Sequence, residues 1–179
     1  NYCCSRVERI RICFRNESSK KFNVLKSNQQ ITSLMQTNEY KSISDEILKN
    51  ANQLVSFGHS RLVTNGSQLD SNNNQPVVKD NLIVIHNGII VNASSLWEKF
   101  GLDKCFDIDT EVILSLINHF RNTTNLNSVE IIRIVMNEIK GTVSTCMFFE
   151  KLNEALIFTN NGSLYYATNK SDFLIFASE

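Results

Sequence analysis

Three short segments of the chain carry side chains whose chemistry is complementary. In residues 58–66, Arg61 offers a planar guanidinium fork that suits a carboxylate. In residues 86–92, Asn87 and Gly88 offer a side-chain amide and a backbone N–H that can hold a developing oxyanion. In residues 107–112, Asp109 offers an anion that suits an ammonium group. Together the segments fit the binding of an amino acid whose side-chain carbonyl is attacked.

Each of these residues also has an ordinary structural role open to it. Arg61 can form a surface ion pair, and Asp109 can cap a helix. Asn87 and Gly88 can simply form a hairpin turn. The joint occurrence of the segments in this order favours a shared site over these separate roles.

The histidines and cysteines indicate no second site. His59 and His86 fit buried, hydrogen-bonded histidines better than bases, because neither lies in a nucleophile–base motif. The cysteines are odd in number and scattered, so neither a disulfide framework nor a zinc site is expected, and a reducing compartment fits best. They are Cys3, Cys4, Cys13, Cys105 and Cys146.

Composition excludes several classes of protein. Lys and Arg number 18, as do Asp and Glu, so neither nucleic acid nor a membrane surface is an expected partner. A chain of 179 residues with 42% hydrophobic residues predicts a single domain with one core. No apolar stretch approaches the roughly 20 residues of a membrane span, and the first residues lack the order of a signal peptide. A cytoplasmic location is therefore expected.

The first part of the chain is expected to hold two strands, one helix and a long loop. Apolar residues recur at short spacing in residues 9–14 and 22–25 around a polar turn, which predicts a β-hairpin. Residues 44–55 begin with capping residues and repeat apolar side chains at helical spacing. Residues 58–76 are rich in Asn, Ser, Gly and Gln, so a functional loop is expected there.

A buried strand, a turn and three helices are expected in the middle of the chain. Residues 82–86 form a continuous apolar run, and Asn87 with Gly88 supplies a tight turn before another strand. The helices extend to about residues 100, 120 and 139, and their predicted N-caps are Asn92, Asp109 and Asn127.

The last third of the chain is typical of β-structure. Four β-rich stretches are separated by Asn, Gly and Asp turns, at residues 143–149, 155–159, 164–167 and 173–177. Because strands and helices come in separate blocks, an α+β layered domain is predicted in place of a doubly wound sheet.

The ordered set of motifs resembles the class II glutamine amidotransferase domain, an N-terminal-nucleophile hydrolase, in the form linked to sugar isomerases in glucosamine-6-phosphate synthase. The likeness runs from about residue 57 to the end of the chain. The matching residues are 58–64, Gln75 and Pro76, His86 with Asn87 and Gly88, Asn92, and 109–112.

This resemblance implies a four-layer α-β-β-α sandwich of mainly antiparallel sheets. It implies hydrolysis of L-glutamine to glutamate, with ammonia passed to an acceptor such as a sugar phosphate on a synthase domain or subunit. Neither a metal nor an organic cofactor is required, and a homodimer is compatible with it. A domain of an asparagine-synthetase-like enzyme is a less favoured alternative, because Ile89 stands where those enzymes usually have Glu.

The resemblance also assigns roles in the site. Arg61 would bind the α-carboxylate of glutamine, Asp109 would receive its α-ammonium group, and Thr64 would line the pocket. Asn87 and the Gly88 amide would form the oxyanion hole.

The nucleophile is not identifiable in this sequence. The family uses a processed N-terminal cysteine whose own α-amine is the base. No strand pattern follows Cys3 or Cys4, although trimming to either residue is an alternative. Our hypothesis is that residues 1–179 form one amidotransferase-like domain that lacks the leading nucleophile strand, a segment between Arg6 and Val7, and any synthase domain. A degenerate module that binds a ligand or partner without catalysis is the alternative function.

Overall fold

The computed structural model describes residues 9–16, 22–27, 31–49, 54–61, 74–149 and 154–178. The chain divides into two compact units, Asn1–Pro76 and Val77–Glu179. Cys3 and Cys4 lie outside the described ranges. The hypothesis of a missing segment between Arg6 and Val7 also concerns residues outside them. The prediction that residues 1–179 act as one functional domain therefore stays a prediction.

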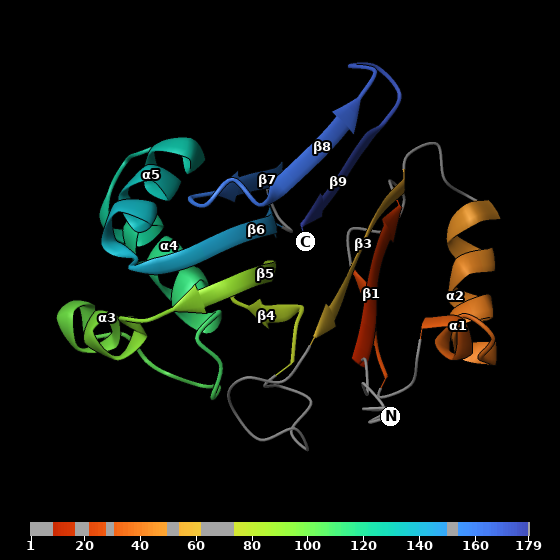
Figure 1. Ribbon diagram of the computed structural model, residues 1–179, viewed down its shortest axis with the longest axis horizontal. Coiled ribbons are helices and arrows are strands. Elements are labelled where there is room, and N and C mark those ends of the chain that lie inside the picture. The colour runs from red at the N-terminus through yellow and green to blue at the C-terminus, as the bar shows by residue number, and fades with distance from the viewer. Residues whose placement is uncertain are drawn as a thin grey trace, which may run out of the picture. The chain divides into compact units, whose positions relative to one another are not determined.

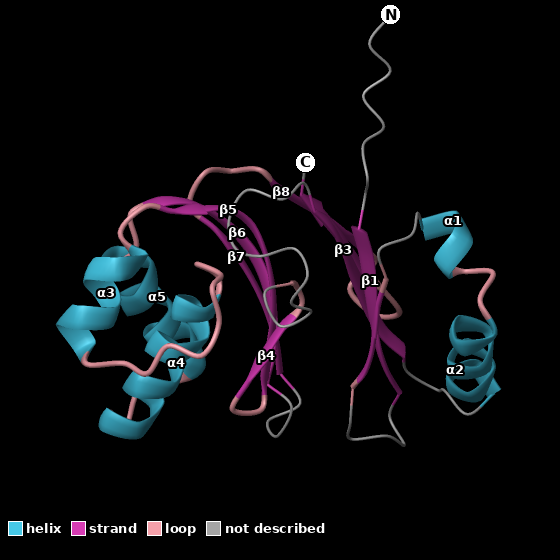
Figure 2. Cartoon of the chain, turned by 90° about the horizontal axis from the view of Figure 1, so that it is seen from below, coloured by secondary structure: helices cyan, strands magenta, loops and turns pink. Residues whose placement is uncertain are grey.

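In the first unit, a three-stranded antiparallel sheet has the order β2-β1-β3 (Figure 1). Its elements are β1 (Arg9–Asn16), β2 (Asn23–Lys26), α1 (Ile31–Leu34), α2 (Asn38–Lys49) and β3 (Leu54–Arg61). The predicted hairpin is confirmed, because β1 and β2 pair with Ile12 opposite Leu25. Leu25 of the sheet and Leu34 of α1 are buried in one apolar cluster, so the helices cover one face of this sheet (Figure 2).

The helix predicted at residues 44–55 is wrong at both ends. The first turn of α2 is capped by Thr37, whose hydroxyl accepts a hydrogen bond from the Tyr40 N–H over 3.2 Å. The last apolar residues of the predicted helix belong to β3, which starts at Leu54 and pairs with β1. Pairing with the distant strand β1 has overridden the local preference for a helix. Tertiary packing contributes more to the structure of a segment than its intrinsic propensity does.

Strand β3 also takes up the start of the loop predicted at residues 58–76. Gly58 is paired with β1, and the strand continues to Arg61. At the other end of the predicted loop, the Lys26 ammonium donates to the Asn74 carbonyl over 3.1 Å. The residues between positions 61 and 74 lie outside the described ranges.

In the second unit, a four-stranded antiparallel sheet has the order β4-β5-β6-β7, and two further strands form a separate hairpin. The strands are β4 (Val77–Lys79), β5 (Leu82–Ile90), β6 (Gly141–Phe149), β7 (Glu154–Thr159), β8 (Leu164–Thr168) and β9 (Leu174–Ser178). The helices are α3 (Ala93–Phe100), α4 (Glu111–Thr123) and α5 (Ser128–Glu138). All three helices cover one face of the four-stranded sheet (Figure 2). The four predicted C-terminal strands are confirmed, within two residues at each end.

The core of the second unit lies between this sheet and its helices. Leu82 and Val84 point into the core from β5, and both side chains are fully buried. The first seven residues of α4 are buried, and Val112 and Leu116 are packed in the same apolar cluster. The first half of α4 therefore lies in the same apolar core as β5.

Two of the three predicted helix caps, Asn127 and Asn92, have different outcomes. The capping box of α5 is confirmed, because Asn127 accepts from the Glu130 N–H over 3.0 Å and the Glu130 carboxylate accepts from the Asn127 N–H over 2.9 Å. Asn92 occupies the N-cap position of α3 without making a capping bond. Its amide instead donates to the Glu138 carbonyl and accepts from the Lys140 N–H, so it ties α3 to the end of α5.

The tight turn predicted at Asn87 and Gly88 is wrong. Strand β5 continues through both residues, which pair with Ser144 and Val143 of β6. The sequence Asn-Gly forms a turn only where the chain reverses, and here the partner strand lies more than fifty residues away. Both residues are thereby displayed on a strand.

Candidate active site

Two glycines allow the end of β5 and the start of β6 to approach closely. Gly88 has φ +143°, and a Cβ added there would lie 1.9 Å from the Thr142 carbonyl oxygen. Gly141 has φ +122°, and its added Cβ would lie 2.0 Å from the Ile89 carbonyl oxygen. Only a residue without a side chain fits either position. The glycines therefore set the geometry of the segment that displays Asn87.

His86 is a buried bridge between β5, β6 and the start of α4. Its Nε2 lies 3.2 Å from the Thr142 carbonyl oxygen, and its Nδ1 lies 3.2 Å from the Thr110 hydroxyl. A carbonyl only accepts, so Nε2 carries the proton and Nδ1 accepts from Thr110 in the neutral ring. Burial lowers the pKa of His86, against a smaller raising effect of the Asp109 charge. His86 is thus the packed, hydrogen-bonded histidine that the sequence predicts.

Asp109 is not the helix cap predicted from the sequence. The N-cap position of α4 is Thr110, which makes no capping bond with its side chain. Oδ2 of Asp109 instead accepts from the Ile90 N–H over 2.9 Å. Within the described part of the chain, Oδ1 accepts no hydrogen bond and is available for a ligand. The hydrogen bond between Ile90 and Asp109 joins the second predicted segment to the third.

Asn87 lies on the sheet face opposite His86, because side chains alternate along a strand. It is half-buried, and its amide donates to the Ser178 hydroxyl of β9 over 3.2 Å. On the neighbouring strand Ser144 lies opposite Asn87, on the same face. An amide N–H displayed on this face is the kind of donor that stabilises an oxyanion.

The first predicted segment belongs to the other unit. Arg61 is the last residue of β3, opposite Arg9, and His59 lies in the same strand opposite Arg11. Thr64 lies outside the described residues. The participation of Arg61 and Thr64 in one site with Asp109 therefore stays a prediction.

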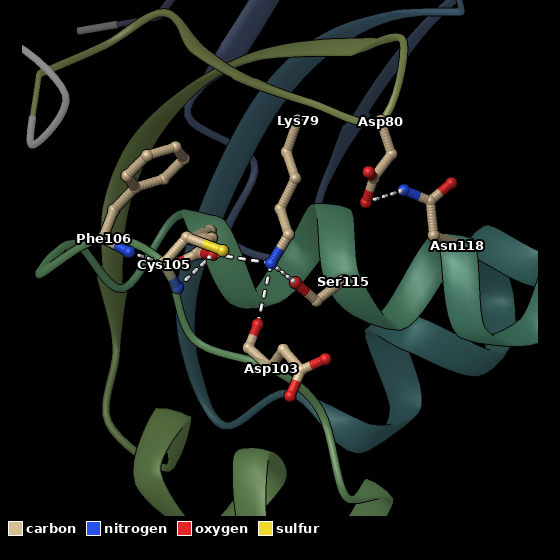
Figure 3. A network of polar contacts seen from close by, with 8 residues as sticks. Lys79, Asp80, Asp103, Cys105, Phe106, Ser115 and Asn118 are labelled. Atoms are coloured by element: carbon tan, nitrogen blue, oxygen red, sulfur yellow. Dashed lines mark hydrogen bonds and ion pairs between the residues drawn. The ribbon is translucent and has the colours of Figure 1, made fainter.

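Sequence reasoning missed one polar network beside Asp109. The Glu111 carboxylate, fully buried, forms a 2.7 Å ion pair with Lys79 of β4 (Figure 3). It also accepts from the backbone N–H groups of Cys105 and Phe106. Glu111 lies in the motif at residues 109–112, but the sequence did not indicate its partner Lys79, which lies 32 residues earlier.

Two cysteine side chains are described, one exposed and one buried. Cys105 and Cys146 are free, and burial raises the pKa of Cys146 to about 12, so its thiol stays protonated at neutral pH. Across the described ranges, no group of three His, Cys, Asp or Glu side chains is placed to hold a metal ion. In the same residues, no helix is long and apolar enough to cross a membrane.

A family model for the glutamine amidotransferase domain matches residues 59–179. The chain belongs to this family. The matched region contains the β5 segment, Asp109 and the Glu111 network. The class II glutamine amidotransferase family predicted from the sequence motifs is thereby confirmed.

Among curated proteins, the chain is similar to glutamine–fructose-6-phosphate aminotransferases [isomerizing]. That of Buchnera aphidicola subsp. Baizongia pistaciae is 28% identical over 158 residues, covering 86% of this chain and 26% of the relative. That of Buchnera aphidicola subsp. Acyrthosiphon pisum is 32% identical over 127 residues, covering 66% of this chain and 21% of the relative. The chain spans about a quarter of the length of these relatives.

Solved structures show the fold. The chain is similar to glutamine phosphoribosylpyrophosphate amidotransferase from B. subtilis, with a TM-score of 0.67, 22% identity and coverage of 94% of this chain and 35% of that one. An allosteric regulatory enzyme of purine biosynthesis matches with a TM-score of 0.64, 24% identity and coverage of 89% and 33%. The predicted α+β fold of the N-terminal-nucleophile hydrolase type is therefore confirmed.

Proposed function

We propose that this chain is the glutamine-hydrolysing part of an amidotransferase, which releases ammonia from L-glutamine for a synthase domain or subunit. The observation that carries the proposal is the hydrogen bond from the Ile90 N–H to Asp109, which unites two motif segments in a member of this family. Because the similar curated proteins are named as fructose-6-phosphate aminotransferases, a sugar phosphate is the proposed acceptor of the ammonia.

Substrate binding would use charge at both ends of the amino acid. Asp109 has one oxygen engaged by Ile90 and the other available, so its carboxylate can face the α-ammonium group of glutamine. Arg61 would bind the α-carboxylate with its guanidinium fork, and Thr64 would line the pocket. This arrangement selects an α-amino acid and leaves the side-chain amide for the reaction.

The reaction would proceed through a thioester. A cysteine thiolate forms a bond to the side-chain carbonyl carbon, and the carbonyl electron pair moves to oxygen. The Asn87 amide and the Gly88 N–H would hold that oxyanion. The C–N bond then breaks, ammonia leaves with the proton that the α-amine took from the thiol, and water hydrolyses the thioester to glutamate. The nucleophile of this step is the N-terminal cysteine expected of the family.

The proposed function includes a cellular compartment and an oligomeric state. The free thiols of Cys105 and Cys146 fit a reducing compartment, which supports a cytoplasmic enzyme. A homodimer is the proposed assembly, and sedimentation of the full-length protein tests it.

The proposal is tested by glutamine turnover of the full-length protein, measured as glutamate and ammonia released, with and without Asp109→Asn. Loss of the charge-assisted bond to an ammonium group should raise the KM for glutamine roughly 10- to 100-fold. Asp107→Asn is the matched control, because Asp107 is an exposed carboxylate two residues away, 3.2 Å from Lys104. It should leave turnover unchanged.

A covalent probe separates an enzyme from a binding module. A cysteine-directed glutamine analogue should label the full-length protein once, with loss of ammonia release. Binding of glutamine without labelling and without turnover would refute the enzyme and support a non-catalytic module.

A further inference from the structure

The Glu111 carboxylate is the centre of a buried network at the start of α4, and Figure 3 labels its partners Lys79, Cys105 and Phe106. Oε1 lies 2.7 Å from Lys79 Nζ and accepts from the Cys105 N–H over 2.9 Å. Oε2 accepts from the Phe106 N–H over 2.8 Å. The side chain is fully buried, and a carboxylate is retained at such a place only when it is paired and hydrogen-bonded.

Lys79 completes the network from the other side. Its ammonium group has three N–H donors, and three acceptors surround it. These are Glu111 Oε1, the Asp103 carbonyl at 2.8 Å and the Ser115 hydroxyl at 3.0 Å. The lysine side chain is 13% exposed, so the pair is largely shielded from solvent. Each charge is therefore fully compensated.

The network holds one particular piece of backbone. The segment from Asp103 to Phe106 has no helix or strand, and it connects α3 to the turn that carries Asp109. Three of its backbone groups, at residues 103, 105 and 106, are bonded to Lys79 or Glu111. Residues 103–105 are exposed, whereas Phe106 packs against the apolar core. The bonds to Lys79 and Glu111 therefore restrain the exposed part of the segment, and Phe106 adds an apolar anchor at its end.

We propose that Lys79 and Glu111 are positioning residues for the recognition of the glutamine ammonium group. They anchor the segment before Asp109 on one side, while the Ile90 N–H fixes the carboxylate itself on the other. Neither residue is assigned a contact with glutamine. The inference rests on the proposed function, because it gives Asp109 its ligand.

The test is a double-mutant cycle on the full-length protein, with glutamine KM and kcat as the readout. Glu111→Gln should raise the KM about tenfold and change kcat less than about twofold, because the chemical step does not involve Asp109. In an Asp109→Asn background the same substitution should add nothing to the KM, because the group it positions is already lost. An equal, additive rise in both backgrounds would overturn the inference.

Two further variants test whether Lys79 and Glu111 have a purely structural role. Glu111→Gln leaves a buried lysine without its counter-charge, so Lys79→Met/Glu111→Gln, which removes both charges, should restore the midpoint of thermal unfolding while the KM stays high. Recovery of both the midpoint and the KM would refute the positioning role. Glu138→Gln is the matched control, because Glu138 forms the ion pair with Lys99 at a more exposed place and should leave KM unchanged.

The outcome also separates this inference from the proposed function. If the wild-type protein turns over glutamine and Asp109→Asn raises its KM, additivity of Glu111→Gln removes only the positioning role. If the wild-type protein neither turns over nor binds glutamine, the proposed function fails, and the inference fails with it.

Discussion

Asp109 accepts a hydrogen bond from the backbone N–H of Ile90 across 2.9 Å, although the two residues lie on different elements. β4 pairs only with Leu82 to Val84 at the start of β5, so a side chain, and not a strand, receives the Ile90 N–H. The carboxylate is held at the strand end that also displays Asn87. The end of β5 and the start of α4 therefore meet at this hydrogen bond.

Replacement of Gly88 should damage both stability and activity. In Gly88→Ala the new Cβ would lie 1.9 Å from the Thr142 carbonyl oxygen, so the end of β5 must shift. We expect a loss of about 2 kcal/mol or more in the free energy of unfolding, measured in urea, with turnover abolished.

Gly101→Ala is the control for the backbone conformation alone. Gly101 also has a positive φ, +59°, but an added Cβ would meet nothing within 4 Å. It should cost only about 1 kcal/mol and leave turnover intact. Equal losses for both variants would show that the contact with β6 at Gly88 is not what requires glycine.

The buried ring of His86 should make stability depend on pH. Burial lowers the pKa of His86 below its ordinary value of 6.5, so the unfolded chain takes up this proton at a higher pH than the folded chain. Its stabilising contribution is therefore complete above 6.5 and is lost as the pH falls through the lowered pKa. The free energy of unfolding should decline as the pH falls below 6.5, and this slope should flatten in His86→Gln. An identical slope in both proteins would rule out this role.

Local signals predicted the elements whose causes are local. Asn127 and Glu130 form their capping box within one helical turn, so the sequence pattern contains the whole interaction. The β1–β2 hairpin was likewise visible, because its two strands are close in sequence and apolar residues recur at short spacing in both. The separate blocks of strands and helices predicted the α+β class, and the family motifs added the N-terminal-nucleophile hydrolase type of that fold.

Distant partners decided the features that the sequence pattern misassigned. Asn87 and Gly88 look like a turn until β6 pairs with them, and that strand begins at Gly141. Asp109 looks like a cap until Ile90, nineteen residues earlier, is placed beside it. Glu111 looks like an ordinary acidic residue of a helix start, because its burial depends on the first seven residues of α4 entering the core. Such contacts require the three-dimensional fold.

The two described cysteine side chains should differ sharply in reactivity. The pKa of the Cys146 thiol is raised to about 12 by burial, so almost no thiolate forms near pH 8, whereas Cys105 is exposed. Iodoacetamide should label Cys105 and spare Cys146 in the folded protein, as read by peptide mass spectrometry. Urea should make both residues reactive, and rapid labelling of Cys146 without urea would contradict its burial.

Removal of the Asn87 amide should slow the chemical step more than it weakens binding. If this amide holds the oxyanion, its bond strengthens as charge develops, so the loss appears in kcat. We expect Asn87→Ala to lower kcat about 10²- to 10³-fold with little change in the KM for glutamine. Asn118→Ala is the control, because that amide donates to Asp80 over 3.1 Å on another part of the same unit. A rise in KM with unchanged kcat would move Asn87 from the oxyanion hole to substrate binding.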